Sequence, residues 1–245
     1  MALKLAIAGA NGRMGRMVSE AAGQDAQVCV YSKFDQGDDV DAALAGAEVL
    51  IDFTRPEATI GHLAVCIKHR VNMVIGTTGF RADQIQQLQQ ATDKIAIVLA
   101  PNMSLGVNVT AKLVAMAAAS LGLDADIEVF EAHHKMKVDA PSGTALMLGA
   151  VAAQARGQSI ESVAVVDRHA TQAARAPGSI GFSSVRAGDI IGDHTVFFAL
   201  NGERIEITHK SSSRATYAQG AVRAAKFLNG KPTGLFTMND VLGLG

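Results

Sequence analysis

Residues 131–145 hold the side chains of this chain that are best suited to chemistry. The run reads Glu-Ala-His-His-Lys-Met-Lys-Val-Asp-Ala-Pro-Ser-Gly-Thr-Ala. Imidazole and ammonium groups, such as those of His133, His134 and Lys137, transfer protons and bind carboxylates. The Pro-Ser-Gly-Thr turn that follows places backbone N–H groups at the start of a predicted helix. The run therefore predicts a site for a small anion with proton transfer close by.

Three interpretations of this run are open from the residues alone. A metal site is disfavoured, because adjacent histidines on a strand point to different faces and no third ligand is evident. A purely structural interpretation makes the histidines and lysines exposed loop residues, which is the ordinary state of such side chains. In the catalytic interpretation His133 delivers a proton, since its ordinary pKa lies near the operating pH.

The catalytic interpretation also assigns the carboxylate-binding groups. Ser142 would cap a helix over residues 144–155, and the N–H groups of Gly143 and Thr144 would then bind a carboxylate. Lys137 and His134 would add positive charge. We favour this interpretation because all of these features occur together within fifteen residues.

A glycine loop near the N-terminus predicts a dinucleotide site. It follows a predicted strand and opens a predicted helix, and its sequence from residue 9 to residue 15 is Gly-Ala-Asn-Gly-Arg-Met-Gly. The first glycine permits a tight turn and the second permits close approach of a pyrophosphate, which then lies at the helix N-terminus. The spacing is a variant of G-x-G-x-x-G, so the strand–loop–helix context carries the prediction. Together with the anion site, it predicts a reductase of a small anionic substrate.

The end of the second predicted strand bears on cofactor choice. Lys33 stands there and suits the 2′-phosphate of NADPH, whereas Asp35, two residues later, suits the free 2′-hydroxyl of NADH. Both can equally be solvated loop residues. We favour NADPH and leave NADH open.

The order of predicted elements indicates an α/β protein with two domains. Short apolar strands alternate with helices through residue 99, which predicts a Rossmann-type doubly wound parallel sheet. Strands without intervening helices follow a long apolar helix, which predicts a second, α+β substrate domain with a mixed sheet. We place the dinucleotide-binding domain at 1–104 and 215–245, and the substrate-binding and oligomerisation domain at 105–214. Residues 169–179 are predicted to form a mobile loop and residues 235–242 a tail.

Composition excludes several classes of function. The 245 residues carry a net charge of −1, which gives no general attraction to nucleic acid or an anionic membrane. We see no stretch that approaches the roughly 20 apolar residues of a membrane span. Cys29 and Cys66 lie in apolar segments without metal-ligand spacing, and we expect both to be reduced core residues. The chain is expected to be soluble and cytoplasmic.

The motif at residues 131–145 resembles the E-x-H-H-x-x-K-x-D-A-P-S-G-T-A signature of the 4-hydroxy-tetrahydrodipicolinate reductases, which act in the diaminopimelate route to lysine. The resemblance covers nearly the whole chain. Further matching segments are 9–15, 52–56, 76–80, 102–104, 106–108, 185–190, 207–210 and 212–214.

This resemblance implies a role for each matching residue. His133 would donate or accept a proton, and Lys137 would be a second proton donor. His134, Gly143 and Thr144 would hold the carboxylates of a small dicarboxylate. The pyrophosphate of the cofactor would be bound by Gly9, Ala10, Asn11, Gly12, Arg13 and Met14. The nicotinamide end would be framed by Gly76, Thr77, Thr78, Ala100, Pro101, Asn102 and Met103.

The resemblance also implies a homotetramer built through the sheet of the second domain. Two positions depart from the family's pattern. Many members have an acidic residue, often followed by Arg, where this chain has Lys33 and Phe34, and this departure supports NADPH. Many members have Phe in place of Met103. Arg214 either touches the substrate or forms a structural salt bridge.

Two rival functions fit the domain organisation. Another two-domain nicotinamide enzyme, acting on an amino or imino acid, would not need the complete signature. A dinucleotide sensor on the same fold would bind cofactor without turnover, and the presence of both His133 and Lys137 counts against it. The fold alone does not decide among these functions.

Overall fold

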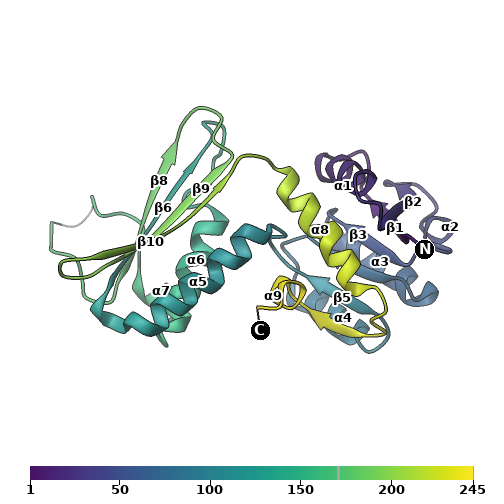
Figure 1. Ribbon diagram of the computed structural model, residues 1–245. Helices are drawn as coiled ribbons and strands as arrows, with labels where there is room; N and C mark the ends of the chain where they lie inside the picture. Colours follow the sequence, from purple (N-terminus) through teal and green to yellow (C-terminus); the bar gives the residue numbers. More distant parts are fainter. Residues whose placement is uncertain (170–171, 245) are drawn as a thin grey trace. The chain divides into compact units, whose positions relative to one another are not determined.

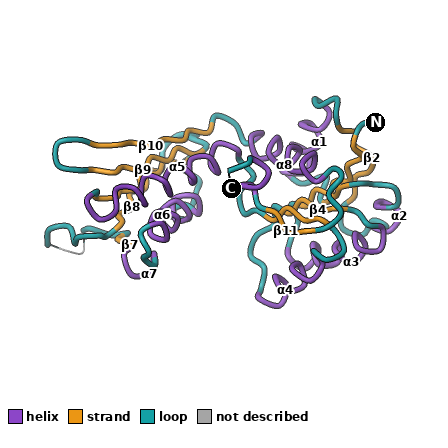
Figure 2. Tube along the Cα trace, turned by 60° about the horizontal axis from the view of Figure 1, so that its bottom comes forward, coloured by secondary structure: helices purple, strands orange, loops and turns teal. Residues whose placement is uncertain are grey.

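The structure, a computed structural model, describes residues 1–169 and 172–244. The chain folds into two compact units, each with its own sheet and core. Unit 1 comprises Met1–Leu105 and the segment from Ala215 onward, and unit 2 comprises Gly106–Arg214. Figures 1 and 2 show the helices and strands of both units.

Unit 1 contains a six-stranded parallel sheet, sheet A, with strand order β11-β5-β4-β3-β1-β2. Its strands are β1 (Leu3–Ala8), β2 (Val28–Phe34), β3 (Val49–Asp52), β4 (Asn72–Ile75), β5 (Ala96–Leu99) and β11 (Gly234–Phe236). Its helices are α1 (Arg13–Gly23), α2 (Val40–Leu44), α3 (Pro56–His69), α4 (Ala82–Ala91), α8 (Ala215–Leu228) and α9 (Met238–Leu242). The predicted Rossmann-type doubly wound sheet is confirmed.

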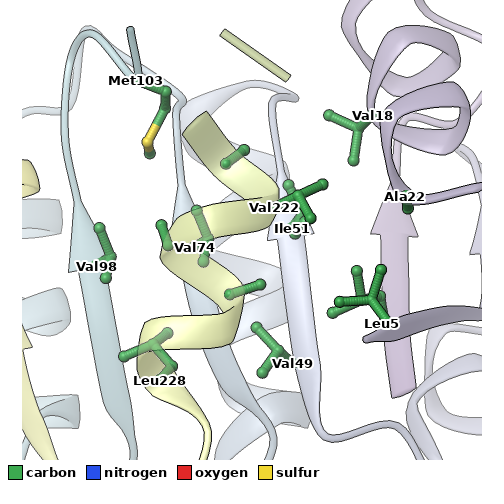
Figure 3. Packing of buried hydrophobic residues seen from close by; sticks show 14 of the residues in the cluster. Leu5, Val18, Ala22, Val49, Ile51, Val74, Val98, Met103, Val222 and Leu228 are labelled. Atoms are coloured by element: carbon green, nitrogen blue, oxygen red, sulfur yellow. The ribbon is translucent and has the colours of Figure 1, made fainter. Parts of the chain in front are cut away.

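Sheet A is buried on both faces, which explains why its strands are almost continuously apolar. One face packs against α1 and α8, where Val18, Val222 and Leu228 meet side chains of β1, β3, β4 and β5 (Figure 3). The other face packs against α2, α3 and α4 through Leu44, Leu63 and Leu88. The sheet is therefore a rigid layer from which loops project at its carboxyl edge.

The pairing register brings the predicted cofactor loops to one edge of sheet A. Ala8 pairs with both Phe34 and Asp52, Asp52 pairs with Ile75, and Ile75 pairs with Leu99. Each of these five residues is the last of its strand. The loops that follow them therefore start side by side at the carboxyl edge, which is where open α/β sheets bind ligands.

Unit 2 is built on a five-stranded sheet, sheet B, with order β10-β9-β6-β8-β7. Its strands are β6 (Asp126–His133), β7 (Ala164–Val165), β8 (Ile180–Arg186), β9 (Gly192–Ala199) and β10 (Arg204–Ser211). Its helices are α5 (Leu105–Leu121), which crosses the unit boundary, the short 3-10 helix η1 (Gly122–Asp124), α6 (Gly143–Ala155) and α7 (Ile160–Val163). Strand β6 pairs antiparallel with β9 and parallel with β8, so the predicted mixed sheet is confirmed.

One face of sheet B is covered by α5 and α6. Val114 and Ala118 of α5 and Leu148 of α6 pack with Val129 and Phe198 of the sheet. On the opposite face, a shallow cleft of about 350 Å³ lies among residues of β6, β8, β9 and β10. Its lining includes the half-buried rings of Phe130 and Phe197.

Several predictions of local structure are wrong. The predicted tail contains β11, which pairs with β5, and helix α9. The second domain, predicted to have strands without intervening helices, contains the short helix α7 directly before the two-residue strand β7. The predicted mobile loop at 169–179 includes residues 170 and 171, which lie outside the described residues. Cys29 is exposed on β2 and only Cys66 is buried, because β2 is an edge strand.

The membrane-span prediction also needs correction. Within the described residues, one helical stretch, Leu105–Asp124, is long and apolar enough by length and composition to cross a membrane. In this structure the face of α5 that bears Val107, Val114 and Ala118 is buried. The stretch therefore contributes a core-facing helix to unit 2.

Candidate active site

The predicted anion site is organised around Glu131, a fully buried carboxylate near the end of β6. One carboxylate oxygen lies 2.5 Å from Nδ1 of His133 and 2.9 Å from a guanidinium nitrogen of Arg186. The other oxygen accepts from Arg186 at 2.8 Å and from the backbone N–H of Ser142 at 3.3 Å. The carboxylate of Glu131 on β6 is thus hydrogen-bonded to β8 and to the turn before α6.

The surroundings of Glu131 keep it ionised. Burial favours its neutral form, but hydrogen bonds, led by those from Arg186, outweigh burial and lower the pKa of the Glu131 carboxyl to about 2. Burial also lowers the pKa of His133, against the opposing effect of Glu131. The site therefore holds an anionic glutamate beside a neutral histidine at neutral pH.

His194 of β9 completes this cluster. Its ring lies 5.1 Å from that of His133 in an edge-on arrangement, and its Nε2 lies 3.1 Å from the hydroxyl of Ser142. Burial lowers the pKa of His194 to about 4, and the nearby His133 adds to this shift. His194 is therefore neutral as well.

The turn after β6 carries the remaining predicted residues. The ammonium of Lys137 pairs with Asp139 at 2.9 Å, and its side chain is 21% exposed. Arg214 lies 3.3 Å from Nε2 of His134. Because a guanidinium only donates, this His134 nitrogen accepts. His134 and Lys137 thus lie on one turn, and Arg214 reaches His134 from the segment that follows β10.

Ser142 is the N-cap of α6, as predicted. Its hydroxyl accepts from the N–H of Ala145 at 3.2 Å. Gly143 is exposed and Thr144 half-buried at the first turn. The first turn of α6 therefore offers backbone N–H groups beside the cluster of Glu131, His133 and His194. The dipole of the helix favours an anion at this position.

The glycine loop of unit 1 has the geometry of a phosphate cradle. Gly9 has φ +65°, and the N–H of Gly12 donates to the carbonyl of Gly9 at 2.9 Å. A Cβ at Gly15 would overlap the backbone of Gly9 and Ala10. Only glycine at this position lets α1 start directly against the loop. Asn11, Gly12 and Arg13 are exposed there.

Lys33 and Asp35 line one cleft of about 420 Å³ beside this loop. Ala10, Asn11, Arg16, Ser19 and Asp38 complete its lining. The carboxylate of Asp35 accepts from the N–H of Asn11 at 3.1 Å. Both groups that bear on cofactor choice therefore lie in the same cleft, with Asp35 attached to the glycine loop.

The residues predicted at the nicotinamide end lie in the loops after β4 and β5. A Cβ at Gly76 would overlap the ring of Phe53, and Thr77 lies in a buried network with Asp52 and Thr59. Thr78 and Pro101 are exposed, Asn102 is half-buried and Ala100 is buried. The side chain of Met103 lies in the core of unit 1 (Figure 3). Any contact of Met103 with a ligand would therefore be through its backbone.

Comparison with known proteins identifies the family. The family description "Dihydrodipicolinate reductase, N-terminus" matches residues 3–103, and "Dihydrodipicolinate reductase, C-terminus" matches residues 106–242. The 4-hydroxy-tetrahydrodipicolinate reductase of Burkholderia cenocepacia is 54% identical over 99% of this chain and 100% of its own length. The chain belongs to the dihydrodipicolinate reductase family. This confirms the family resemblance and makes the chain an oxidoreductase with a Rossmann-type unit for NAD(P)H.

A second relative supports the assignment to the reductase family, and one solved structure matches the fold of this chain. The 4-hydroxy-tetrahydrodipicolinate reductase of Burkholderia vietnamiensis is 53% identical over 99% of this chain and 100% of its own length. A dipicolinate-bound dihydrodipicolinate reductase from Paenisporosarcina sp. TG-14 matches the fold with a TM-score of 0.82 at 24% identity. That alignment covers 98% of this chain and 99% of the other.

The glycine loop and its cleft fit a reduced dinucleotide, the cofactor that a reductase of this family implies. Gly9 and Gly15 allow the close approach of the loop to Thr54 and to helix α1, and Lys33 of β2 and Arg16 of α1 supply cations to the cleft beside it. Within the described residues, no group of three or more His, Cys, Asp or Glu side chains could hold a metal ion.

Sequence reasoning did not assign a role to Glu131, Arg186 or His194. Glu131 stands in the signature, but its contact with Arg186 spans 55 residues along the chain. The signal that could have found it is the position of Glu131 two residues before His133, since alternate residues of a strand share one face.

Proposed function

We propose that this chain uses NAD(P)H to reduce 4-hydroxy-tetrahydrodipicolinate to tetrahydrodipicolinate, with loss of water, in the diaminopimelate route to lysine. The observation that carries this proposal is the cluster at the end of β6. There, His133, His134 and Lys137 lie with the N-terminus of α6 in the arrangement expected for an anionic substrate. The full-length match to relatives named for this activity supports it.

Different residues would bind the substrate and transfer the proton. His134 and the backbone of Gly143 and Thr144 would hold the two carboxylates of the substrate, aided by the dipole of α6. Loss of the 4-hydroxyl, together with a proton from the adjacent ring carbon, as water would first leave a conjugated imine. The reduced nicotinamide, when bound, supplies a hydride to C4 of this imine. The neighbouring ring carbon or the nitrogen must then gain a proton. His133 and Lys137 would carry out this proton transfer.

The cofactor would lie along the carboxyl edge of sheet A. The loop of Gly9, Ala10, Asn11, Gly12, Arg13 and Met14 would bind its pyrophosphate. The loops at 76–78 and 100–103 would frame the nicotinamide end. Lys33, exposed in the cleft beside the glycine loop, favours NADPH because its ammonium would pair with a 2′-phosphate.

We further propose a homotetramer that uses the face of sheet B opposite α5 and α6. Phe130 and Phe197 lie in the shallow cleft on that face, and a sheet face that bears such rings is suited to burial against another subunit. A cytoplasmic location is consistent with the unpaired thiols of Cys29 and Cys66.

Replacement of Lys137 by alanine tests the proposed chemistry. We expect Lys137→Ala to lower kcat by at least about 10²-fold, because a proton-transfer group is lost. The Kd for NADPH should stay unchanged, because Lys137 lies in unit 2 and the glycine loop lies in unit 1. Lys135→Ala is the matched control, since Lys135 is an exposed lysine of the same turn. Unchanged kcat in Lys137→Ala would remove Lys137 from the mechanism.

A further inference from the structure

We infer that Glu131, held by Arg186, is a positioning residue that fixes His133 as a proton acceptor, with its proton on Nδ1 and its lone pair on Nε2. This inference rests on the proposed function for its catalytic meaning. It adds to that function a division of labour, in which His133 accepts a proton and Lys137 donates one.

The geometry of β6 places the proton of His133 on Nδ1. Glu131 and His133 lie on the same face of β6, and the carboxylate oxygen reaches Nδ1 at 2.5 Å. An ionised carboxylate has no proton to donate, so Nδ1 must carry the hydrogen of this bond. In the neutral imidazole the other nitrogen, Nε2, then has the free lone pair.

Arg186 keeps Glu131 ionised, which is the form that this hydrogen bond requires. Two guanidinium nitrogens bind the two carboxylate oxygens at 2.9 and 2.8 Å, which is a bidentate pair. Because Arg186 already balances the charge of Glu131, the carboxylate does not need a histidinium partner. Breaking such a buried pair leaves an uncompensated charge, so Arg186 and Glu131 act as one unit.

Of the charged groups around His133, Lys137 and Arg186 favour its neutral form and Glu131 opposes it, while His194 is itself neutral. Arg186 comes from β8, His194 from β9 and Lys137 from the turn that follows His133. The cations Lys137 and Arg186 repel a second positive charge on the ring, and burial penalises it further. A neutral ring with Nε2 unprotonated would accept the proton that a ring carbon gives up as water is lost and pass it to the departing hydroxyl, which leaves the ammonium of Lys137 to donate the proton that the ring gains after hydride transfer.

Glu131 also connects the proton site to the anion site. Its second oxygen accepts from the backbone N–H of Ser142, the N-cap of α6. A change at residue 131 is therefore expected to affect kcat through His133 and, more weakly, the KM of the substrate through the start of α6.

The direct test is the tautomer of His133 in the whole protein, measured by ¹⁵N–¹H NMR of the histidine side chains at neutral pH. We expect the Nδ1–H tautomer in the unmodified protein and a mixture with the Nε2–H tautomer in Glu131→Gln. An Nε2–H tautomer in the unmodified protein would overturn the inference. This readout needs no turnover, so it remains decisive even if the proposed reaction fails.

The pH dependence of kcat/KM is the second test, and its two variants should shift in opposite directions. Glu131→Gln removes the anion that stabilises a histidinium, so the acidic limb should move to lower pH. Arg186→Gln removes a repelling cation, so this limb should move to higher pH. If Glu131 and Arg186 had only a structural role, the acidic limb would not move in opposite directions in the two variants. A shift of this limb in the same direction in both variants would contradict the inference.

The fall in kcat of Glu131→Gln can be compared with that of a control variant. Glu131→Gln should lower kcat by at least about 10²-fold, with a smaller rise in KM. Glu161→Gln is the control, because Glu161 is an exposed glutamate on α7. If the unmodified protein shows the expected tautomer but no turnover of 4-hydroxy-tetrahydrodipicolinate, the proposed substrate is wrong and the positioning role of Glu131 stands.

Discussion

Replacement of Gly15 by alanine should weaken cofactor binding without disturbing the rest of the molecule. An added Cβ would overlap the carbonyl oxygen of Gly9 and lie 2.7 Å from Cα of Ala10. Ordinary van der Waals contact begins at 3.4 Å, so helix α1 and the glycine loop must separate by at least about 0.7 Å. Neither partner is a flexible side chain, so the backbone must take up this movement.

The cost follows from that displacement. Overpacking of this kind costs about 1–3 kcal/mol. Because the displaced loop is the one expected to bind the pyrophosphate, we expect most of this cost to appear in cofactor affinity. Since about 1.4 kcal/mol corresponds to a factor of ten, the Kd for NADPH should rise by about 10- to 100-fold.

Fluorescence titration with NADPH measures this effect. Gly23→Ala is the matched control, because Gly23 ends the same helix and an added Cβ there meets nothing within 4 Å. The control should bind NADPH as the unmodified protein does and gain up to about 1 kcal/mol in stability. Wild-type NADPH affinity in Gly15→Ala would refute the assignment of this loop to the cofactor.

Two further predictions concern charge. Lys33→Glu should lower the ratio of kcat/KM for NADPH to kcat/KM for NADH by at least about 10-fold, because the 2′-phosphate of NADPH would lose its cationic partner. Steady-state kinetics with both cofactors measures this ratio. Lys94→Glu is the control: Lys94 lies at the amino edge of sheet A, and its replacement should leave the ratio unchanged. Stability should fall as the pH falls from about 6.5 to about 4, because the folded-state pKa of His194 lies below its unfolded value and its stabilising contribution is present only above about pH 6.5. The full loss is about 3 kcal/mol by linkage, measured by urea unfolding across this range; an equal pH dependence in His194→Asn would contradict this cause.

The parts of the fold that were predictable from sequence are those set by local pattern. The strands of sheet A are short apolar runs between helices, and Ser142 caps α6 because a serine before Gly143 offers its hydroxyl to the first turn. Strand β11 was missed because it is only three residues long and pairs with β5, more than one hundred residues earlier in the chain.

The candidate site shows the same limit. His133, Lys137 and the Ser142 turn are adjacent in sequence, so their grouping was predictable. The partners that set their chemistry come from other strands: Arg186 from β8 and His194 from β9. Pairing between strands distant in sequence depends on the whole of sheet B, and no local pattern specifies it. The burial of Met103 likewise depends on α8, a helix from the far end of the chain.

The most direct test of the account is oxidation of NADPH and NADH, in parallel, by the purified protein given freshly made 4-hydroxy-tetrahydrodipicolinate. We expect rapid oxidation that depends on this substrate, with the higher kcat/KM for NADPH. Binding of both cofactors without oxidation of either would contradict it, and would instead indicate a dinucleotide sensor or an enzyme for a different imine.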